Sequence, residues 1–403
     1  MALISVAEAL ARVLDGAEPL PAESVPLAQA EGRVLAEDLA SRRTQPPADV
    51  SAMDGYAVRA ADVASAPARL TLVGEVAAGR PLAGTIEAGQ AARIFTGGVL
   101  PAGTDAVVIQ ENTRREGDIV VVAIPSSSGK NVRAAGLDFR EGAVLLRKGR
   151  RLTGRDVALA AAMNHPSVPV HRRPRIALVA TGDELVAPGS EPGPGQIIHS
   201  NAFALAAVTR HEGAEPIDLG ILPDLLDETI AGVRRARDAG ADVLVTAGGA
   251  SVGDYDLVQP ALAAEGLALA FWKVAVRPGK PLLSGTLGAM RVLGLPGNPV
   301  SAYVCSVLFL SPLIRRLSGR ADLTPPLESA ALGRPLPAND ERQDYLRATL
   351  TRGADGTLLA TPFPVQDSSM LTPLAGADCL VIRAPFAPAA QAGEPCQIVK
   401  LDD

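Results

Sequence analysis

Between residues 175 and 319, short apolar runs alternate with segments of helical length, and this alternation limits the fold more than any other feature of the 403-residue chain. Residues 175–180 are predicted to form a buried strand, and 201–211 a helix that begins at Ser200 or Asn201 and stops at Gly213. The same pattern predicts strands at 216–221, 242–246, 268–276 and 291–295, and helices at 225–238 and 299–317. Strands that alternate with such helices form a covered parallel sheet, so we expect a central three-layer, parallel-sheet α/β domain.

Shorter β-type runs flank this region on both sides. On the N-terminal side, one or two β-rich modules are predicted, with strands at 70–76, 106–109 and 119–124 and no long helical pattern after residue 65. Residues 168–174 are interpreted as a linker into the central domain. On the C-terminal side, strands at 345–350, 357–361, 379–383 and 397–401 indicate a small β-barrel. The expected fold class is therefore multidomain, α/β plus β.

The composition is that of a globular protein. The net charge is −6 and the pI is near 5.4, whereas a general binder of nucleic acid is expected to be basic. Cys305, Cys379 and Cys396 are far apart, which fits reduced thiols and supplies no zinc framework. The first 20 residues include Glu8 and Asp15 and are interpreted as an amphipathic helix, not a signal peptide. The most apolar later run is much shorter than the ~18 residues of a membrane span, so we expect a soluble, cytoplasmic protein without membrane contact.

Acidic and glycine-rich residues follow two of the predicted strands. Gly182 permits a tight turn after residues 175–180, and two acids, Asp183 and Glu184, come next; a turn with solvated acids is the simpler interpretation. After residues 242–246 come Gly248, Gly249, Ser251 and Gly253, whose backbone N–H groups would approach an anion, and then Asp254 and Asp256, which would hold Mg²⁺ against phosphate. The spacing matches neither a dinucleotide fingerprint nor a Walker A loop.

Two further loops carry basic or anion-binding character. Lys273, Arg277 and Lys280 fall within eight residues that Pro278 and Pro281 stiffen; they face an anion or are solvated surface. Asn298 is a suitable helix N-cap, and Pro299 follows at the favoured first position, so this loop is a well-built helix start and also an anion site.

The combination of these loops narrows the chemistry. Two bare carboxylates ~4 Å apart repel each other by about 4 kcal/mol at an effective dielectric constant near 20. A metal ion, a shared proton or nearby Lys and Arg side chains relieve that repulsion. An acidic cluster beside a basic loop and two anion-binding turns indicates phosphoryl or phosphate-anhydride chemistry.

At these residues the chain resembles the molybdopterin molybdenumtransferase family, which includes the E domain of gephyrin and its plant counterpart. The resemblance covers essentially the whole chain. Besides the four loops, it rests on Met53-Asp54-Gly55-Tyr56-Ala57-Val58, Arg93-Ile94-Phe95-Thr96-Gly97, Asn131-Val132-Arg133 with Gly136 and Asp138, Gly195-Gln196-Ile197, Ser200-Asn201, and Arg342 with Tyr345-Leu346-Arg347.

The resemblance implies an enzyme, a molybdopterin molybdotransferase. It would take adenylylated molybdopterin and molybdate, cleave the phosphoanhydride with a divalent cation such as Mg²⁺, and release AMP during molybdenum-cofactor biosynthesis. It also implies a homodimer with the active site between subunits, and contact with the adenylylating enzyme and with molybdoenzyme acceptors. The implied domains are an N-terminal and linker region (1–170) with an inserted β-rich module (about 50–137), a molybdopterin-binding-like α/β domain (171–323) and a C-terminal β-barrel (324–403).

Site roles follow from the same resemblance. The implied catalytic residues are Asp54, Thr96, Asp138, Glu184 and Asp256, and the implied metal ligands are Glu184, Asp224, Asp254 and Asp256. Substrate binding is implied for Gly248, Gly249, Ser251, Gly253, Lys273, Arg277, Lys280, Pro281, Asn298, Ser301, Arg342 and Ser368, of which Arg342 and Ser368 match positions associated with molybdate. Fixed cations and hydroxyls suit a dianion.

Three residues depart from the family pattern. Arg277 stands where many members have Lys, Leu137 replaces an acid before Asp138, and His199 stands where Asn or Asp is usual.

Alternative interpretations remain at this stage. Without the resemblance, Asp54-Gly55 is a plain hairpin turn. The α/β domain is also similar to nucleotide pyrophosphatases of the competence-damage type and to the adenylylating partner enzyme, against which the Asp54 region and the C-terminal barrel argue. A non-enzymatic scaffold, as in the receptor-anchoring role of the gephyrin E domain, is a third reading.

Overall fold

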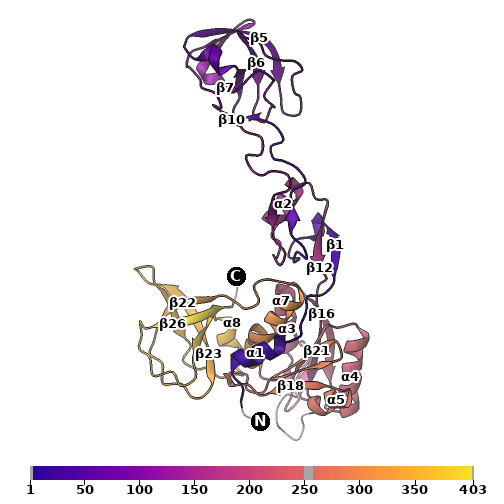
Figure 1. The fold of residues 1–403 in the computed structure, drawn as a ribbon. Helices are drawn as coiled ribbons and strands as arrows, with labels where there is room; N and C mark the ends of the chain where they lie inside the picture. The colour runs from indigo at the N-terminus through magenta and orange to yellow at the C-terminus, as the bar shows by residue number, and fades with distance from the viewer. Residues whose placement is uncertain (1–2, 249–256, 402–403) are drawn as a thin grey trace.

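The computed structural model describes residues 3–248 and 257–401, which form an elongated molecule. A β-rich module lies at one end, a small stalk follows in the middle, and an α/β body lies at the other end beside the C-terminal barrel (Figure 1). The predicted fold class, multidomain α/β plus β, is confirmed.

The central sheet has the strand order β16-β13-β17-β21-β20-β18. Four strands run parallel: β13 (Arg175–Thr181), β16 (Glu215–Leu222), β17 (Val243–Ala247) and β21 (Met290–Leu295). The last two, β20 (Leu283–Leu287) and β18 (Ala268–Trp272), are antiparallel to their neighbours. The expected parallel sheet is therefore present, but it ends at this edge in an antiparallel hairpin that supplies a strand, β20, that was not predicted.

Helices cover both faces of this sheet, which explains why its central strands β13, β17 and β21 are mostly apolar. On one face lie α1 (Val6–Leu14), α3 (Asn201–His211) and the run α6 (Pro299–Cys305), η4 (Ser306–Leu310) and α7 (Ser311–Leu317). On the other lie α4 (Leu226–Asp238) and α5 (Val258–Ala264). Alternate residues of β13 enter the two cores, Ile176 on the first side and Ala177 on the second.

One helical run, Pro299–Leu317, is long and apolar enough to cross a membrane, but 83% of its apolar window is buried inside the protein. It is a core helix of the α/β body. Ser306–Leu310 within it is a π-helical turn.

The stalk corrects two sequence expectations. Residues 168–174 were interpreted as a linker, but β12 (Ser167–His171) pairs antiparallel with β1 (Ala22–Pro26), and its Val168 and Val170 are fully buried. A helix, α2 (Gly154–Ala162), occurs where none was expected; it is held by a capping box in which Thr153 and Asp156 bond reciprocally. The remaining stalk elements are η1 (Leu27–Gln29), β2 (Leu39–Ala40) and β11 (Val144–Leu146).

The distal module is a six-stranded sheet of order β7-β4-β6-β5-β9-β8. Its strands are β4 (Gly55–Val58), β5 (Ala68–Val76), β6 (Gln90–Ile94), β7 (Ala106–Ile109), β8 (Thr113–Glu116) and β9 (Ile119–Val122), with η2 (Ala60–Val63) and η3 (Gln110–Asn112) between them. β3 (Val50–Ser51) pairs with β10 (Val132–Arg133), not with β4, so Asp54-Gly55 is not a hairpin turn. Gly55 is required because a Cβ there would lie 2.0 Å from Val108 O.

The C-terminal sheet closes on itself as a barrel. Its order is β23-β24-β22-β26-β25, and β25 pairs back to β23. The strands are β22 (Leu327–Leu332), β23 (Gln343–Arg352), β24 (Leu358–Pro362), β25 (Cys379–Arg383) and β26 (Pro395–Lys400), with α8 (Leu371–Ala375) before β25. The predicted strand at 268–276 ends at Trp272, and β19 (Val276–Arg277) pairs instead with β23, which ties the barrel to the α/β body.

Candidate functional site

The carboxyl ends of β13, β17 and β21 bring three of the predicted loops into contact. Gly248 follows β17 with φ +103°, and a Cβ there would lie 2.8 Å from Thr181 O at the end of β13. A Cβ on Gly297, after β21, would lie 3.6 Å from the Cα of Gly248. Parallel strands place their carboxyl ends at one edge, where such sheets bind ligands.

Acidic residues from two neighbouring strands gather at this edge. Asp183 Oδ1 accepts the backbone N–H of Asp224 at 3.1 Å, and Asp224 Oδ2 accepts that of Asp183 at 3.4 Å. Glu184 lies beside them; its Oε2 is 2.4 Å from the position that a Cβ on Gly182 would occupy, and Gly182 has φ +146°, a backbone conformation that glycine adopts most readily. The backbone O of Glu184 accepts the N–H of Ile197 at 2.7 Å, but its carboxylate makes no hydrogen bond or ion pair with the residues that the structure describes, so it is open to a cation or a proton from their side.

Part of the predicted site lies outside the described residues, namely Gly249, Ser251, Gly253, Asp254 and Asp256. Among residues 3–248 and 257–401, no group of three or more His, Cys, Asp or Glu side chains is arranged to hold a metal ion. Of the four predicted metal ligands, only Glu184 and Asp224 lie within the described residues.

A hydrogen-bonded junction joins the same edge to the C-terminal barrel. Asn298 Nδ2 donates to Ser368 Oγ at 3.0 Å, and the N–H of Val300 donates to Ser368 O at 3.1 Å. Asn298 occupies the N-cap position of α6, but its side chain makes no capping hydrogen bond, contrary to the expectation from sequence. Asn201, at the start of α3, donates to Gly297 O at 2.7 Å and fixes this loop from the other side.

A buried arginine holds the loop that carries Ser368. Arg347 is 1% exposed, and its guanidinium donates to Asp367 O and Met370 O, each at 2.9 Å. No role was expected for Arg347 from the sequence. A charged residue between the apolar Leu346 and Ala348 of a predicted strand was the signal that could have revealed one.

Arg277 and Arg342 meet at one carboxylate that the sequence analysis did not single out. Arg277 Nη1 donates to Asp340 Oδ2 at 3.0 Å, and Arg342 Nη2 donates to the same oxygen at 2.8 Å. Arg277 also contacts Asp344 and, at 2.9 Å, Asn339. The hydrogen bonds from Arg342, with the charge of Arg277, lower the pKa of Asp340 to about 2.

The other basic-loop residues are placed as follows. Lys273 has φ +84°, and its ammonium lies 4.9 Å from the centroid of the Trp272 ring, which is a cation–π contact. Lys280 is exposed and Pro281 is half-buried. Ser301 is 4% exposed within the first turn of α6, so it would need an opening of this turn to touch a ligand through its side chain.

A second predicted cluster lies in the distal module. Asp54 Oδ1 accepts both the N–H and the hydroxyl of Thr96, each at 2.8 Å, and these bonds, the backbone one first, lower the pKa of Asp54. Arg93 lies between the rings of Tyr56 and Phe95, with its Cζ 5.2 and 4.7 Å from their centroids. The carboxylate is thus held ionised on a rigid support.

The structure does not bring this second cluster to the sheet edge within one chain. Asp54 and Thr96 belong to the module at the far end of the molecule, whereas the loops after β13, β17 and β21 lie on the body (Figure 1). Asp138 follows β10 in the connection back to the stalk; its side chain is exposed, and the neighbouring Leu137 is 64% exposed.

His199 lies at the start of α3 and is buried. Its Nε2 accepts the N–H of Ala202 at 3.3 Å, which is the interaction that an Asn or Asp side chain supplies at a helix start. Burial lowers the pKa of His199, and the charge of Asp218 opposes this only in part. A neutral imidazole therefore satisfies a helix N–H group here.

Family models match almost the whole chain. The MoeA N-terminal region (domain I and II) matches residues 4–164, a probable molybdopterin binding domain matches 177–316, and the MoeA C-terminal region (domain IV) matches 329–401.

Individual proteins with similar sequences or structures agree with these family-model matches. A molybdopterin molybdenumtransferase from Nostoc sp. is 44% identical over 309 residues, covering 74% of this chain and 70% of the relative. One from Bacillus subtilis is 36% identical over 387 residues, covering 94% and 90%. The solved structure of a molybdopterin biosynthesis MoeA protein from Pyrococcus horikoshii superposes with a TM-score of 0.86 at 31% identity and covers all of both chains.

Proposed function

This chain belongs to the molybdopterin molybdenumtransferase (MoeA) family of molybdenum-cofactor biosynthesis, and we propose that it inserts molybdenum into adenylylated molybdopterin with release of AMP. The observation that carries the proposal is the meeting of acidic, glycine-rich and helix-start loops at one edge of the sheet, against Ser368 of the barrel. Such an edge offers carboxylates for a cation and N–H groups for an anion side by side.

The acidic side of this edge suits a hard divalent cation. Glu184 and Asp224 present carboxylate oxygens, the ligands that Mg²⁺ prefers, and the proposal adds Asp254 and Asp256 as further ligands. A bound divalent cation neutralises charge that develops on phosphate oxygens when the anhydride is cleaved. The reciprocal bonds between Asp183 and Asp224 hold the two strand ends at a fixed separation before any ligand arrives.

The basic side suits molybdate, a dianion. Asp340 clamps Arg277 and Arg342 against each other, which fixes both guanidinium groups while leaving each with further N–H donors. Ser368, its partner Asn298 and the exposed Lys280 complete the proposed anion-binding surface, and Lys273 and Pro281 belong to the same loop as Lys280.

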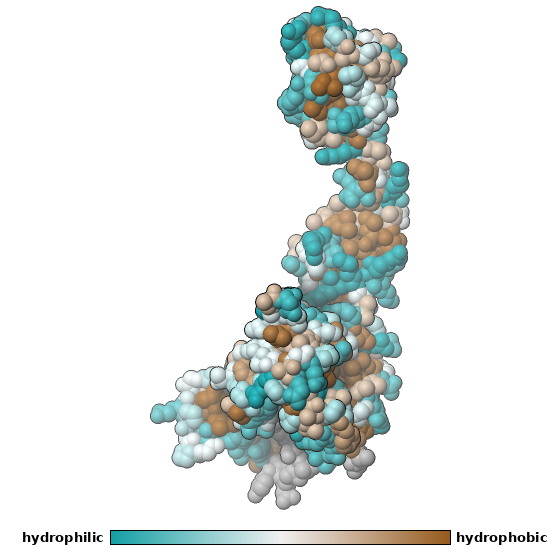
Figure 2. All heavy atoms as spheres, turned by 90° about the vertical axis from the view of Figure 1, so that its left-hand side faces the viewer, coloured by the Kyte–Doolittle hydropathy of each residue, from teal (hydrophilic) through white to brown (hydrophobic). Residues whose placement is uncertain are grey.

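The catalytic residues of the distal module would act on a partner subunit. Within one chain Asp54, Thr96 and Asp138 lie away from Glu184, so the proposed site is complete only when a second copy supplies them. Hydrophobic residues are exposed on the stalk in Figure 2, and a homodimer would cover such a surface. We therefore propose an inter-subunit active site in a homodimer.

The remaining partners follow from the same proposal. The adenylylating enzyme would deliver the substrate, and apo-molybdoenzymes would accept the product. Cys305, Cys379 and Cys396 are free, which agrees with the reducing cytoplasm as the place of action.

Molybdate dependence tests the proposal. Purified protein with Mg²⁺ should release AMP from adenylylated molybdopterin, faster with molybdate than without, and Glu184→Ala and Asp54→Ala should lose this release. Asp118→Ala, an exposed carboxylate of the distal module, is the control and should retain it. AMP release at the same rate with and without molybdate would indicate a nucleotide pyrophosphatase. The absence of AMP release from a folded dimer would favour a non-enzymatic scaffold.

A further inference from the structure

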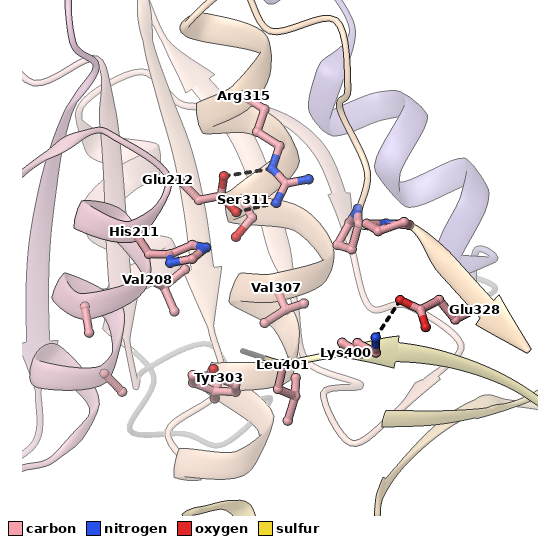
Figure 3. A pocket seen from close by; sticks show the side chains of 14 residues that line it. Val208, His211, Glu212, Tyr303, Val307, Ser311, Arg315, Glu328, Lys400 and Leu401 are labelled. Carbon is pink, nitrogen blue, oxygen red and sulfur yellow. Dashed lines mark hydrogen bonds and ion pairs between the residues drawn. The ribbon is translucent and has the colours of Figure 1, made fainter. Parts of the chain in front are cut away.

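Two cavities differ in the balance of their charges, and the second shares Arg277, Asn339 and Asp344 with the arginine cluster described above. The first, of about 340 Å³, lies between α3, the helical run Pro299–Leu317 and the barrel (Figure 3). Its charged groups neutralise one another: Glu212 pairs with Arg315 at 2.7 Å, and Lys400 with Glu328 at 2.9 Å. It therefore offers no charge that would select a ligand.

The second cavity, of about 380 Å³, is built on the barrel. Part of its wall is apolar and is formed by Pro335, Pro337, Pro362, Leu346 and the ring of Phe363. A volume of this size is within the roughly 300–1,000 Å³ usual for small-molecule pockets. Flat proline and phenylalanine faces favour a planar ligand.

The charges in this cavity are unbalanced in favour of cations. Arg277, Arg334 and Arg383 line it, against a single carboxylate, Asp344. Arg277 is engaged by Asp340 and Asp344, and Arg383 donates to Pro337 O and Pro388 O. Arg334 makes no hydrogen bond or ion pair with any residue in the described ranges, so a half-buried guanidinium remains for an anion.

Asp344 contributes to the lining of this cavity a carboxylate oxygen that accepts no hydrogen bond from the described residues. The residue is 4% exposed, one oxygen contacts Arg277, and Oδ1 has no hydrogen-bond partner among the described residues. A buried carboxylate oxygen without a donor is costly, and an N–H group of a ligand ring would satisfy it. Burial raises the pKa of Asp344, in agreement with this unsatisfied environment.

We propose that this cavity binds a planar heteroaromatic ring that bears a phosphate group, with Arg334 on the phosphate, Phe363 against the ring and Asp344 facing its N–H groups. The proposal rests on the proposed function, because adenylylated molybdopterin carries two such units, the adenylate and the pterin phosphate. Gln366 lines the cavity two residues before Ser368, so a ligand held there would lie next to the junction at Asn298.

Calorimetry with AMP, adenosine, inorganic phosphate and molybdopterin tests this assignment. Arg334→Ala should weaken the binding of AMP, of molybdopterin or of both by about tenfold or more, the loss expected for one charge-assisted hydrogen bond, and should hardly change that of adenosine. Phe363→Leu should weaken the binding of adenosine as well as that of AMP if the adenylate occupies the cavity, and that of molybdopterin if the pterin does. Arg352→Ala, an exposed arginine of the same barrel, is the matched control and should bind as the wild type does.

The ligand whose binding the variants weaken shows whether the adenylate or the pterin phosphate occupies the cavity. Weakened AMP binding places the adenylate in the cavity, and weakened molybdopterin binding with unchanged AMP binding places the pterin phosphate there. Wild-type affinities for both ligands in folded Arg334→Ala and Phe363→Leu protein would overturn the proposal.

Photolabelling keeps the test independent of variant folding. Wild-type protein labelled with 8-azido-AMP should carry the label on the peptide that contains Phe363 if the adenylate occupies the cavity. Molybdate-dependent AMP release by the wild type is measured separately. Its presence, together with normal binding by the variants, would reject the cavity assignment alone, whereas its absence would reject the proposed function.

Discussion

Thr96 donates both its backbone N–H and its hydroxyl to the same oxygen of Asp54, each over 2.8 Å. The two residues are separated by 42 positions and belong to different segments of the distal module. This arrangement keeps Asp54 ionised and fixes its direction, which suits a carboxylate that acts on a ligand held by another surface.

Replacing the hydroxyl should change the pH dependence of activity. Thr96→Val retains the backbone donor and removes the second one, so the pKa of Asp54 should rise from its lowered position toward the ordinary value. If ionised Asp54 is needed, the acid limb of the pH–rate profile for AMP release should move to higher pH. Thr96→Ser keeps both donors and should leave the limb in place; an unmoved limb in Thr96→Val would contradict the role of Asp54.

Subunit mixing should restore activity if the site lies between subunits. Asp54→Ala and Glu184→Ala proteins should each be inactive, but a mixed dimer contains one site with both residues intact. After full exchange of equal amounts, about a quarter of the wild-type AMP release should return, since half of the dimers are mixed. Two Asp54→Ala preparations mixed together serve as the control, and no recovery in the first mixture would place the complete site in one chain.

His199 should make the α/β body less stable in acid. Its folded pKa lies below the unfolded value of 6.5, so its contribution is complete above pH 6.5 and is lost as the pH falls through the folded pKa. The unfolding temperature of the wild type should therefore fall more between pH 7.5 and pH 5.5 than that of His199→Asn, whose side-chain oxygen accepts from Ala202 without titrating. Equal falls in the two proteins would contradict the neutral imidazole.

The buried ion pair at the end of α3 should be required for stability. Glu212 bonds Arg315 through two contacts of 2.7 Å and also Arg320 at 2.9 Å, and all three side chains are largely buried. Glu212→Ala leaves buried guanidinium charge without a partner and should cost about 3–5 kcal/mol in free energy of unfolding. Glu328→Ala breaks the more exposed pair with Lys400 and should cost about 1 kcal/mol or less. Denaturant titration of both variants compares these values.

Local signals in the sequence predicted many of the elements. The helix Asn201–His211 and the strands Ala106–Ile109 and Cys379–Arg383 were predicted with the bounds that the structure shows, because their periodicity and flanking turn residues are contained within a few positions. The strand β12 was missed because its burial depends on pairing with β1, which lies over 140 residues earlier. The helix α2 was missed because its capping box uses Asp156 in place of the usual Glu or Gln.

Some residues of the candidate site were likewise predictable from local sequence, and others were not. Residue type and turn chemistry alone pointed to Glu184, Gly248 and Asn298, since strand ends, glycines and helix starts can be read from neighbouring residues. The partner of Arg277 could not be read in this way, because Asp340 is 63 positions away and reaches it only through the pairing of β19 with β23.

The sequence by itself therefore determined many of the segments that become strands, helices and ligand-type loops, because periods of 2 and 3.6 residues and helix caps are local properties. Only the tertiary structure decided which loops meet at one sheet edge, that Arg347 supports Ser368, and that the stalk holds Asp54 away from Glu184 in the same chain. Those relationships depend on packing and pairing between distant segments, and no local pattern of residues encodes them.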